Sequence, residues 1–242
     1  MKKIKSLIKS IAQNISIKLL RAAFPNERVV PRGYVYERAI EYSFAFEVLM
    51  EYKKKNILDV GSGKSAFPAL LVNCGFNVTA IDKVRDYYKG IKGEINYHFK
   101  VINDDICNLS REYDLFDAIT CISVLEHIDN PTLAVKNMAS LLKPGGILIL
   151  TFPFTTYEYI PNVYDLPDSD ELSSRFQYKA QSFTEENLAE WEKQFGIKEI
   201  KRVYIRGWNG RYWRCGNRIA FPHATNNPKE ANAVCLAYKS GF

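Results

Sequence analysis

An apolar run that passes directly into a glycine turn constrains this chain more than any other feature of its sequence. Asn56–Val60 is short and largely apolar, which is typical of a strand buried on both faces of a sheet. Gly61 and Gly63 follow, and Phe67–Asn73 then has the pattern of a helix that ends before Gly75. A strand, a glycine turn and a helix in this order predict the first unit of a parallel α/β sheet.

The same alternation continues along the chain. Further strands are expected at Val78–Ile81, Tyr97–Ile102, Ala118–Ile122, Ile147–Phe152, Ile197–Val203 and Ala233–Tyr238. Helices are expected at 36–52, at Leu133–Leu142 and from a Thr184 cap to Phe195, with Gly196 as its stop. Strands that alternate with helices favour right-handed crossovers. We therefore expect an α/β, doubly wound, mostly parallel seven-stranded sheet of the Rossmann-like kind, with an N-terminal helical extension.

The N-terminal extension, residues 1–30, has the pattern of a basic amphipathic helix. Its apolar residues recur at helical spacing, namely Ile4, Leu7, Ile8, Ile11, Ile15 and Leu19. Lysines fill much of the other face. Two interpretations stay open: a helix that packs on protein, including a second copy of the chain, or a helix that lies on a membrane surface.

Residues 31–242 are expected to form the main domain. Its first half spans 55–152. An insertion at 153–181 contains three prolines and six aromatic residues, and this length is unusual for a simple connection. The last strands and the loop between them occupy 197–242.

Charge and cysteine content exclude several classes of protein. Of the net charge of +6, six positive charges fall in the first segment, which leaves the rest of the chain close to neutral. A nearly neutral body does not fit a nucleic-acid-binding surface. The five cysteines are widely spaced and include no CxxC pair, which indicates reduced thiols and no metal site. With no transmembrane-length run and no clear signal peptide, we expect a cytoplasmic protein, or one peripheral to the membrane.

Three cofactors compete for the glycine turn. A P-loop would need a glycine five positions before Gly63, but position 58 is Leu, so this interpretation fails. A dinucleotide site fits Gly61, Gly63 and Ala66, with Asp82 at the distance of a ribose ligand. Taken alone, this pattern is ambiguous, and the surrounding sequence has to decide.

Five blocks in order resemble the class I S-adenosylmethionine-dependent methyltransferases of the small-molecule type. They are Ile57–Gly63, Val78–Asp82, Asn103–Ile106, Phe116–His127 with its Leu-Glu-His run, and Leu141–Leu148. Together they cover about residues 55–152. In one departure, Ser65 stands where the family frequently has a third glycine.

The resemblance implies S-adenosylmethionine as cofactor and a set of residues that bind it. The set is Asp59, Gly61, Gly63, Asp82, Lys83, Asp105, Ile106 and Ile122. Asp59 is expected near the ammonium group, Asp82 on the ribose hydroxyls, and Asp105 with Ile106 around adenine. Two alternatives stay open: Asp59 satisfies backbone amides at the turn, or Asp104 replaces Asp105 at adenine.

Methyl transfer to oxygen benefits from a base, and His127 is the candidate because it follows the fourth strand at the carboxyl edge of the sheet. The alternative is a histidine that pins a loop. The acceptor is expected to meet aromatic and arginine side chains of 153–181 and 206–223, namely Tyr157, Tyr159, Tyr164, Trp208, Trp213, Arg206, Arg211 and Arg214. These suit a polar ring or an anionic group.

The sequence therefore predicts a methyltransferase that acts on a small molecule or a glycan intermediate, most often at oxygen. Two other function classes stay open. One is an NAD-dependent oxidoreductase, for which no convincing hydride-transfer constellation is seen. The other is a non-catalytic module with a methyltransferase fold.

Overall fold

The computed structural model describes residues 35–63, 65–83, 101–170 and 178–241. The predicted N-terminal helix and residues 97–100 of the predicted third strand lie outside these ranges. The described part of 35–242 forms one compact unit. Within the described residues, no helix is long and apolar enough to cross a membrane.

A single sheet of eight strands organises this unit, in the order β3-β2-β1-β4-β5-β8-β6-β7. The strands are β1 (Asn56–Val60), β2 (Asn77–Asp82), β3 (Val101–Asn103), β4 (Phe116–Ile122), β5 (Leu142–Pro153), β6 (Ile197–Trp208), β7 (Arg218–Thr225) and β8 (Ala233–Ser240). β1 to β5 pair in parallel, whereas β8 pairs antiparallel with both β5 and β6, and β7 antiparallel with β6. The predicted mostly parallel α/β fold is confirmed.

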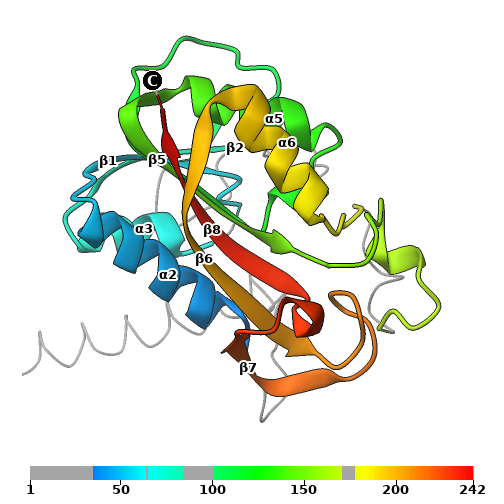
Figure 1. Ribbon diagram of the computed structural model, residues 1–242. Coiled ribbons are helices and arrows are strands. Elements are labelled where there is room, and N and C mark those ends of the chain that lie inside the picture. Colours follow the sequence, from blue (N-terminus) through cyan, green and yellow to red (C-terminus); the bar gives the residue numbers. More distant parts are fainter. Residues whose placement is uncertain (1–34, 64, 84–100, 171–177, 242) are drawn as a thin grey trace, which may run out of the picture. The chain divides into compact units, whose positions relative to one another are not determined.

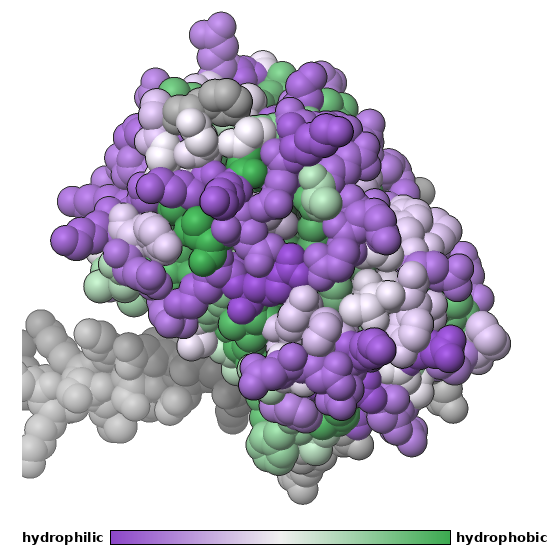
Figure 2. Space-filling view, viewed as in Figure 1, coloured by the Kyte–Doolittle hydropathy of each residue, from purple (hydrophilic) through white to green (hydrophobic). Residues whose placement is uncertain are grey.

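Helices cover both faces of the sheet (Figure 1). One face buries α2 (Arg38–Glu51) and α3 (Phe67–Asn73) against a core that includes Ile57, Ala118 and Ile149. The other face buries α5 (Pro131–Ser140) and α6 (Glu185–Phe195) against a second core. Consecutive strand residues point to opposite faces, so strands buried on both sides are continuously apolar. Hydrophilic residues cover most of the outer surface seen from the same side (Figure 2).

The predicted ends of α6 are confirmed, whereas α5 begins and ends two residues before the predicted Leu133–Leu142. Thr184 and Asn187 form the capping box of α6, and Gly196 ends that helix in the left-handed conformation, at φ +61°. α5 begins at Pro131 because the side chain of Asn130 accepts a hydrogen bond from the Leu133 amide.

The predicted count of seven strands is one too low, because β7 lies in the region for which the sequence predicts a loop. Its sequence, Arg218–Thr225, contains Pro222, which sequence reasoning places outside the middle of a sheet. β7 is an edge strand, so a proline, which has no backbone N–H to donate, is tolerated there. Most of its residues are partly or fully exposed, which removes the apolar signal of a buried strand.

Residues of β2 and of the segment after β4 pack tightly against the glycine turn that follows β1. Gly61 has φ +76°, and its amide donates to the Ile81 carbonyl of β2 at 2.8 Å. A Cβ at this position would lie 2.2 Å from Cγ1 of Val124. Only glycine fits, for reasons of both backbone conformation and space.

The substitution Gly61→Ala should therefore destabilise the fold more than Gly75→Ala does. Gly75 also has a positive φ, of +92°, but a Cβ there would meet nothing within 4 Å. Gly75→Ala should cost about 1–2 kcal/mol from backbone strain alone. Gly61→Ala should cost a further 1–3 kcal/mol, approximately, from overpacking. Urea denaturation measures both free energies of unfolding, and equal losses would contradict the packing argument.

Candidate active site

The chain reverses its direction of travel across the sheet between β1 and β4. β1, β2 and β3 run outward in one direction, and β4 then returns to the other side of β1. The crevice at the carboxyl ends of strands next to such a switch point is where open α/β sheets bind ligands. The glycine turn after Val60, the Asp82–Lys83 pair and Ser123 all lie at this edge.

Asp82 closes the glycine turn from the end of β2. Its Oδ2 accepts a hydrogen bond from the Gly63 amide at 2.6 Å, and the residue is buried. Burial raises the pKa of the Asp82 carboxyl to about 6, although the Gly63 amide acts in the opposite direction. The sequence-predicted residues Gly61, Gly63 and Asp82 are thus brought together.

Asp59 lies deeper, on β1. Its Oδ1 accepts a hydrogen bond from the Thr120 hydroxyl of β4 at 2.6 Å, in an environment closed to solvent. Burial raises the pKa of Asp59 to about 7, opposed by the Thr120 hydrogen bond, and the charge of Asp82 adds to the increase. Because Thr120 lies on the neighbouring strand, this hydrogen bond also links β1 to β4.

The structure separates the roles of the two acids that follow β3. The buried Asp104 accepts hydrogen bonds from the Asp105 and Ser110 amides, both at 2.9 Å, and from the Tyr113 hydroxyl at 2.6 Å. Burial alone would raise the pKa of Asp104, but these bonds outweigh it and hold the pKa below its usual value. Asp104 thus fastens the turn.

Asp105 is the more accessible of the two acids. Its side chain is 28% exposed, and its Oδ2 lies 3.2 Å from Nζ of Lys83. This ion pair joins the residues that follow β2 and β3, so two predicted cofactor residues face each other. Ile106 and Ile122, the other two, are buried in the cores on opposite faces of the sheet.

Sequence reasoning missed a polar cluster contributed by α2. The buried carboxylate of Glu41 accepts hydrogen bonds from Ser123 Oγ at 2.7 Å and from Thr151 Oγ1 at 2.8 Å. Arg38, one turn earlier, donates to its other oxygen at 2.6 Å. The cluster ties α2 to the carboxyl ends of β4 and β5. A signal existed in the sequence: Arg38 and Glu41 are spaced by three on a helix whose inner stripe is otherwise apolar.

Ser123 marks the same place through its backbone. It is a non-glycine residue at φ +48°, directly after β4, and its amide donates to the carbonyl and to the hydroxyl of Thr151, at 2.9 Å each. Left-handed residues of this kind cluster at functional sites, where the surrounding structure holds them.

His127 lies in the short helical turn η1 (Leu125–His127) that follows this edge. Its Nδ1 lies 2.6 Å from the carbonyl oxygen of Lys179, and its Nε2 lies 3.8 Å from Oε1 of Glu126. Because a carbonyl oxygen only accepts, Nδ1 carries a proton. The imidazole also meets the Tyr178 ring edge-on at 4.5 Å between centroids.

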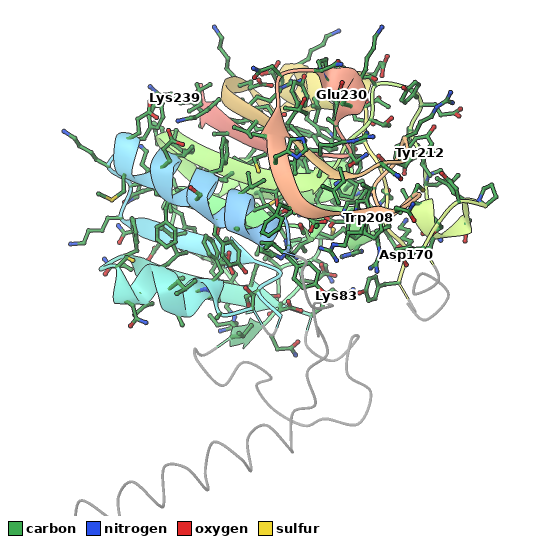
Figure 3. The ribbon with its side chains drawn as sticks, turned by 90° about the horizontal axis from the view of Figure 1, so that it is seen from below. Lys83, Asp170, Trp208, Tyr212, Glu230 and Lys239 are labelled. Carbon is green, nitrogen blue, oxygen red and sulfur yellow. The ribbon has the colours of Figure 1, made fainter. Side chains whose placement is uncertain are left out.

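The insertion contacts both His127 and the last loop. A bridge joins Ser169 with Cys215, and the Asp170 amide donates to the Arg214 carbonyl at 2.9 Å. In Figure 3, Asp170, Trp208 and Tyr212 lie in one part of the molecule, away from Lys239, which pairs with Ile147 of β5. From the Tyr178 ring, a row of aromatic rings continues to Tyr164 at 6.4 Å and then to Trp213 at 6.4 Å.

The arginines of this region already have partners within the chain. Arg206 donates to the backbone carbonyls of Asn209, Gly210 and Glu230. Arg211 lies over the Tyr157 ring, and Arg214 forms an ion pair with Asp170 at 2.7 Å. The described residues contain no cluster of three or more metal-ligating side chains.

Comparison with known proteins agrees with this geometry. The family model described as a methyltransferase domain matches residues 32–201, more than half of the chain. The ubiquinone biosynthesis O-methyltransferase of Coxiella burnetii is 28% identical over 159 residues, which are 60% of this chain and 64% of that protein. Its counterpart in Xanthomonas oryzae is 34% identical over 101 residues, which are 39% of this chain and 41% of that protein. The matches thus span less than two thirds of either relative.

Solved structures share the fold. The magnesium protoporphyrin IX methyltransferase of Synechocystis, crystallised with S-adenosylhomocysteine, aligns with a TM-score of 0.55 at 12% identity, over 98% of this chain and 99% of that one. The family match and this architecture confirm the methyltransferase fold and the cofactor that the five sequence blocks implied. The chain belongs to the class I S-adenosylmethionine-dependent methyltransferase family.

Proposed function

We propose that this protein transfers the methyl group of S-adenosylmethionine to an oxygen atom of a small molecule or a glycan intermediate. The observation that carries the proposal is the position of His127, between the switch-point edge of the sheet and the row of aromatic rings. Two relatives whose names denote O-methyltransferases support transfer to oxygen.

The buried carboxyls and the tight turn at this edge fit the cofactor. Asp82 is assigned to the ribose hydroxyls, and Asp105 with Ile106 to adenine, beside Lys83. Asp59 is assigned to the cationic methionine end, near the backbone of Ile122. Gly61 and Gly63 allow the cofactor to approach the backbone. Carboxyl groups whose pKa burial has raised gain most when a cation or hydroxyl donors arrive.

Arg38 is assigned to the methionine carboxylate. Glu41 holds its guanidinium next to the carboxyl ends of β4 and β5, where the methionine end of the cofactor would lie. A guanidinium is suited to a carboxylate because it offers several donors in a fixed plane.

For the acceptor, the paired arginines favour a neutral ring over a phosphorylated metabolite. Aromatic side chains offer flat, apolar contact with a polar edge, which suits a hydroxylated ring. When bound, the cofactor supplies a methyl carbon whose bond to sulfur breaks as the bond to oxygen forms, leaving a neutral thioether. His127 takes the hydroxyl proton at Nε2, and alignment and exclusion of water supply much of the rest.

The family match argues against the NAD-dependent oxidoreductase interpretation. The non-catalytic interpretation makes a different prediction from ours. Incubation with S-adenosylmethionine and a panel of phenols, catechols and sugars should yield a methyl ether from at least one class. Cofactor binding without turnover across the panel would favour the non-catalytic module.

Asp82→Asn should weaken cofactor binding without unfolding the protein. The loss of charge-assisted hydrogen bonds to the ribose should reduce affinity about 30- to 150-fold, or about 2–3 kcal/mol. In the parent protein, affinity should rise as pH increases through about 6, because the ionised carboxylate accepts the ribose hydroxyls. That part of the pH dependence should vanish in the variant. Calorimetry measures both effects, with the exposed Asp114→Asn as control. Unchanged affinity would remove Asp82 from the site.

His127→Gln should reduce turnover about a hundredfold or more, while cofactor affinity stays nearly constant. The pH–rate profile should lose its ascending limb, because the base that titrates there is gone. Steady-state kinetics with the acceptor from the panel, together with calorimetry, separates the two effects. Turnover within a few-fold of the parent, with the same pH profile, would assign His127 a structural role.

Residues 2–23 are proposed to mediate peripheral membrane contact or self-association. If the contact is with a membrane, full-length protein should sediment with vesicles of anionic lipid, and protein lacking 2–23 should not. Equal sedimentation of both proteins would leave self-association, which light scattering on the same pair would test.

A further inference from the structure

Glu126 is a buried carboxyl at the acceptor side of the site. The residue is 1% exposed, and its Oε1 lies 3.8 Å from Nε2 of His127. Among the described residues, its Oε2 has no hydrogen-bond partner. Burying a carboxyl oxygen without a hydrogen-bond partner costs free energy, so such a group calls for an explanation.

The η1 turn does not need the Glu126 side chain for its shape. Its backbone is held by Gln181, whose amide and side-chain Nε2 both donate to the Glu126 carbonyl, at 3.0 and 3.2 Å. Nε2 of Gln181 also donates to the Ile128 carbonyl at 2.7 Å. The backbone of the turn is therefore held by Gln181 and not by the Glu126 carboxyl group.

The same backbone segment fixes the imidazole. The Lys179 carbonyl binds Nδ1 of His127, and the next amide, of Ala180, donates to Oδ1 of Asn162 at 3.1 Å. With the proton held at Nδ1, the basic nitrogen is Nε2, the atom nearer to Glu126. The chain thus places a basic nitrogen and a buried carboxyl next to each other.

Other charged and titratable groups surround this pair. From α2 they are Arg38 and Glu41, from β4 Cys121, and from the insertion Tyr164, Tyr178 and Lys179, the last of which pairs with Asp129. Burial raises the pKa of Glu126 to about 8, its own amide and Arg38 oppose the increase, and Glu41 adds to it. Because the two side chains lie this close, the protonation of Glu126 and that of His127 depend on each other.

We propose that Glu126 is a positioning residue that acts through His127, so that the base of the reaction is the Glu126–His127 pair. This inference rests on the proposed O-methyl transfer. The form of the pair that accepts the proton is a carboxylate beside a neutral imidazole, and its population rises as pH increases through about 8, where Glu126 ionises. The hydroxyl proton moves to Nε2 of His127, and the resulting imidazolium lies beside a carboxylate, so that no net charge is left in the buried site. Because 3.8 Å exceeds hydrogen-bond length, the carboxylate acts through its charge.

The pair can be tested without any acceptor. The sequence has three histidines, so NMR of histidine-labelled protein can follow each imidazole separately. The variant His127→Gln assigns the His127 signal, and the His223 signal serves as internal reference. An anion within about 4–6 Å raises the pKa of an imidazole. In the parent protein, the imidazole should therefore keep part of its proton up to the pH at which Glu126 ionises, and in Glu126→Gln the His127 titration midpoint should fall by about one pH unit.

Two further variants control for loss of the native side chain. Glu126→Asp keeps the charge and should keep the midpoint closer to that of the parent. Glu190→Gln makes the same change on the exposed face of α6 and should leave it unchanged. Identical His127 midpoints in the parent and in Glu126→Gln would overturn the proposal, whatever the turnover.

Kinetics supply the second readout. In Glu126→Gln, the ascending limb of the pH–rate profile should move to lower pH and maximal turnover should fall, with cofactor affinity unchanged. If His127→Gln kept full turnover while the NMR shift was present, the proposed base would fail but the pair would stand. A lower turnover with an unmoved pH profile would show that Glu126 acts only structurally.

Discussion

The parallel pairing of β1 with β4 is the interaction on which the rest of the structure depends. It creates the switch point, and its register sets Asp59 opposite Thr120, whose hydroxyl binds the buried carboxylate. The glycine turn, Asp82 and Ser123 then meet at one edge because the neighbouring strands end there. The Ser123 hydroxyl in turn donates a hydrogen bond to Glu41, which attaches α2 to this edge. A ligand site of this kind follows from topology before any particular side chain is chosen.

Three buried carboxyl groups at or near that edge have perturbed protonation equilibria. Asp59, Asp82 and Glu126 all have raised pKa values, and in each case burial is the main cause. Such groups hold protons that the unfolded chain would release at the same pH, so the empty protein loses stability as pH rises from about 4 to 8. Under the proposed assignment, a cationic cofactor beside Asp59 and Asp82 would offset part of this cost by stabilising the ionised carboxylates.

The cofactor half of the molecule could be predicted from sequence because its signals are local. The run into Gly61, the acid at the end of β2 and the helix stop at Gly75 each act within a few residues. The acceptor side could not, because its contacts join distant segments: Lys179 with His127, Arg214 with Asp170, and Gln181 with Glu126. β7 was missed because its half-exposed edge position and Pro222 remove the usual strand pattern. Arg38 and Glu41 were missed because two charged residues in the apolar stripe of a helix do not reveal by their spacing that they are buried as an ion pair.

A structure of the protein with S-adenosylhomocysteine bound tests the central claim, that the carboxyl edge at the β1–β4 switch point is the cofactor site. We expect the ribose hydroxyls to lie within hydrogen-bond distance of Asp82, with adenine against Ile106 beside Asp105 and the sulfur next to the end of β4. The methionine carboxylate should lie on Arg38. A ligand bound elsewhere, or bound here with its ribose away from Asp82, would contradict it.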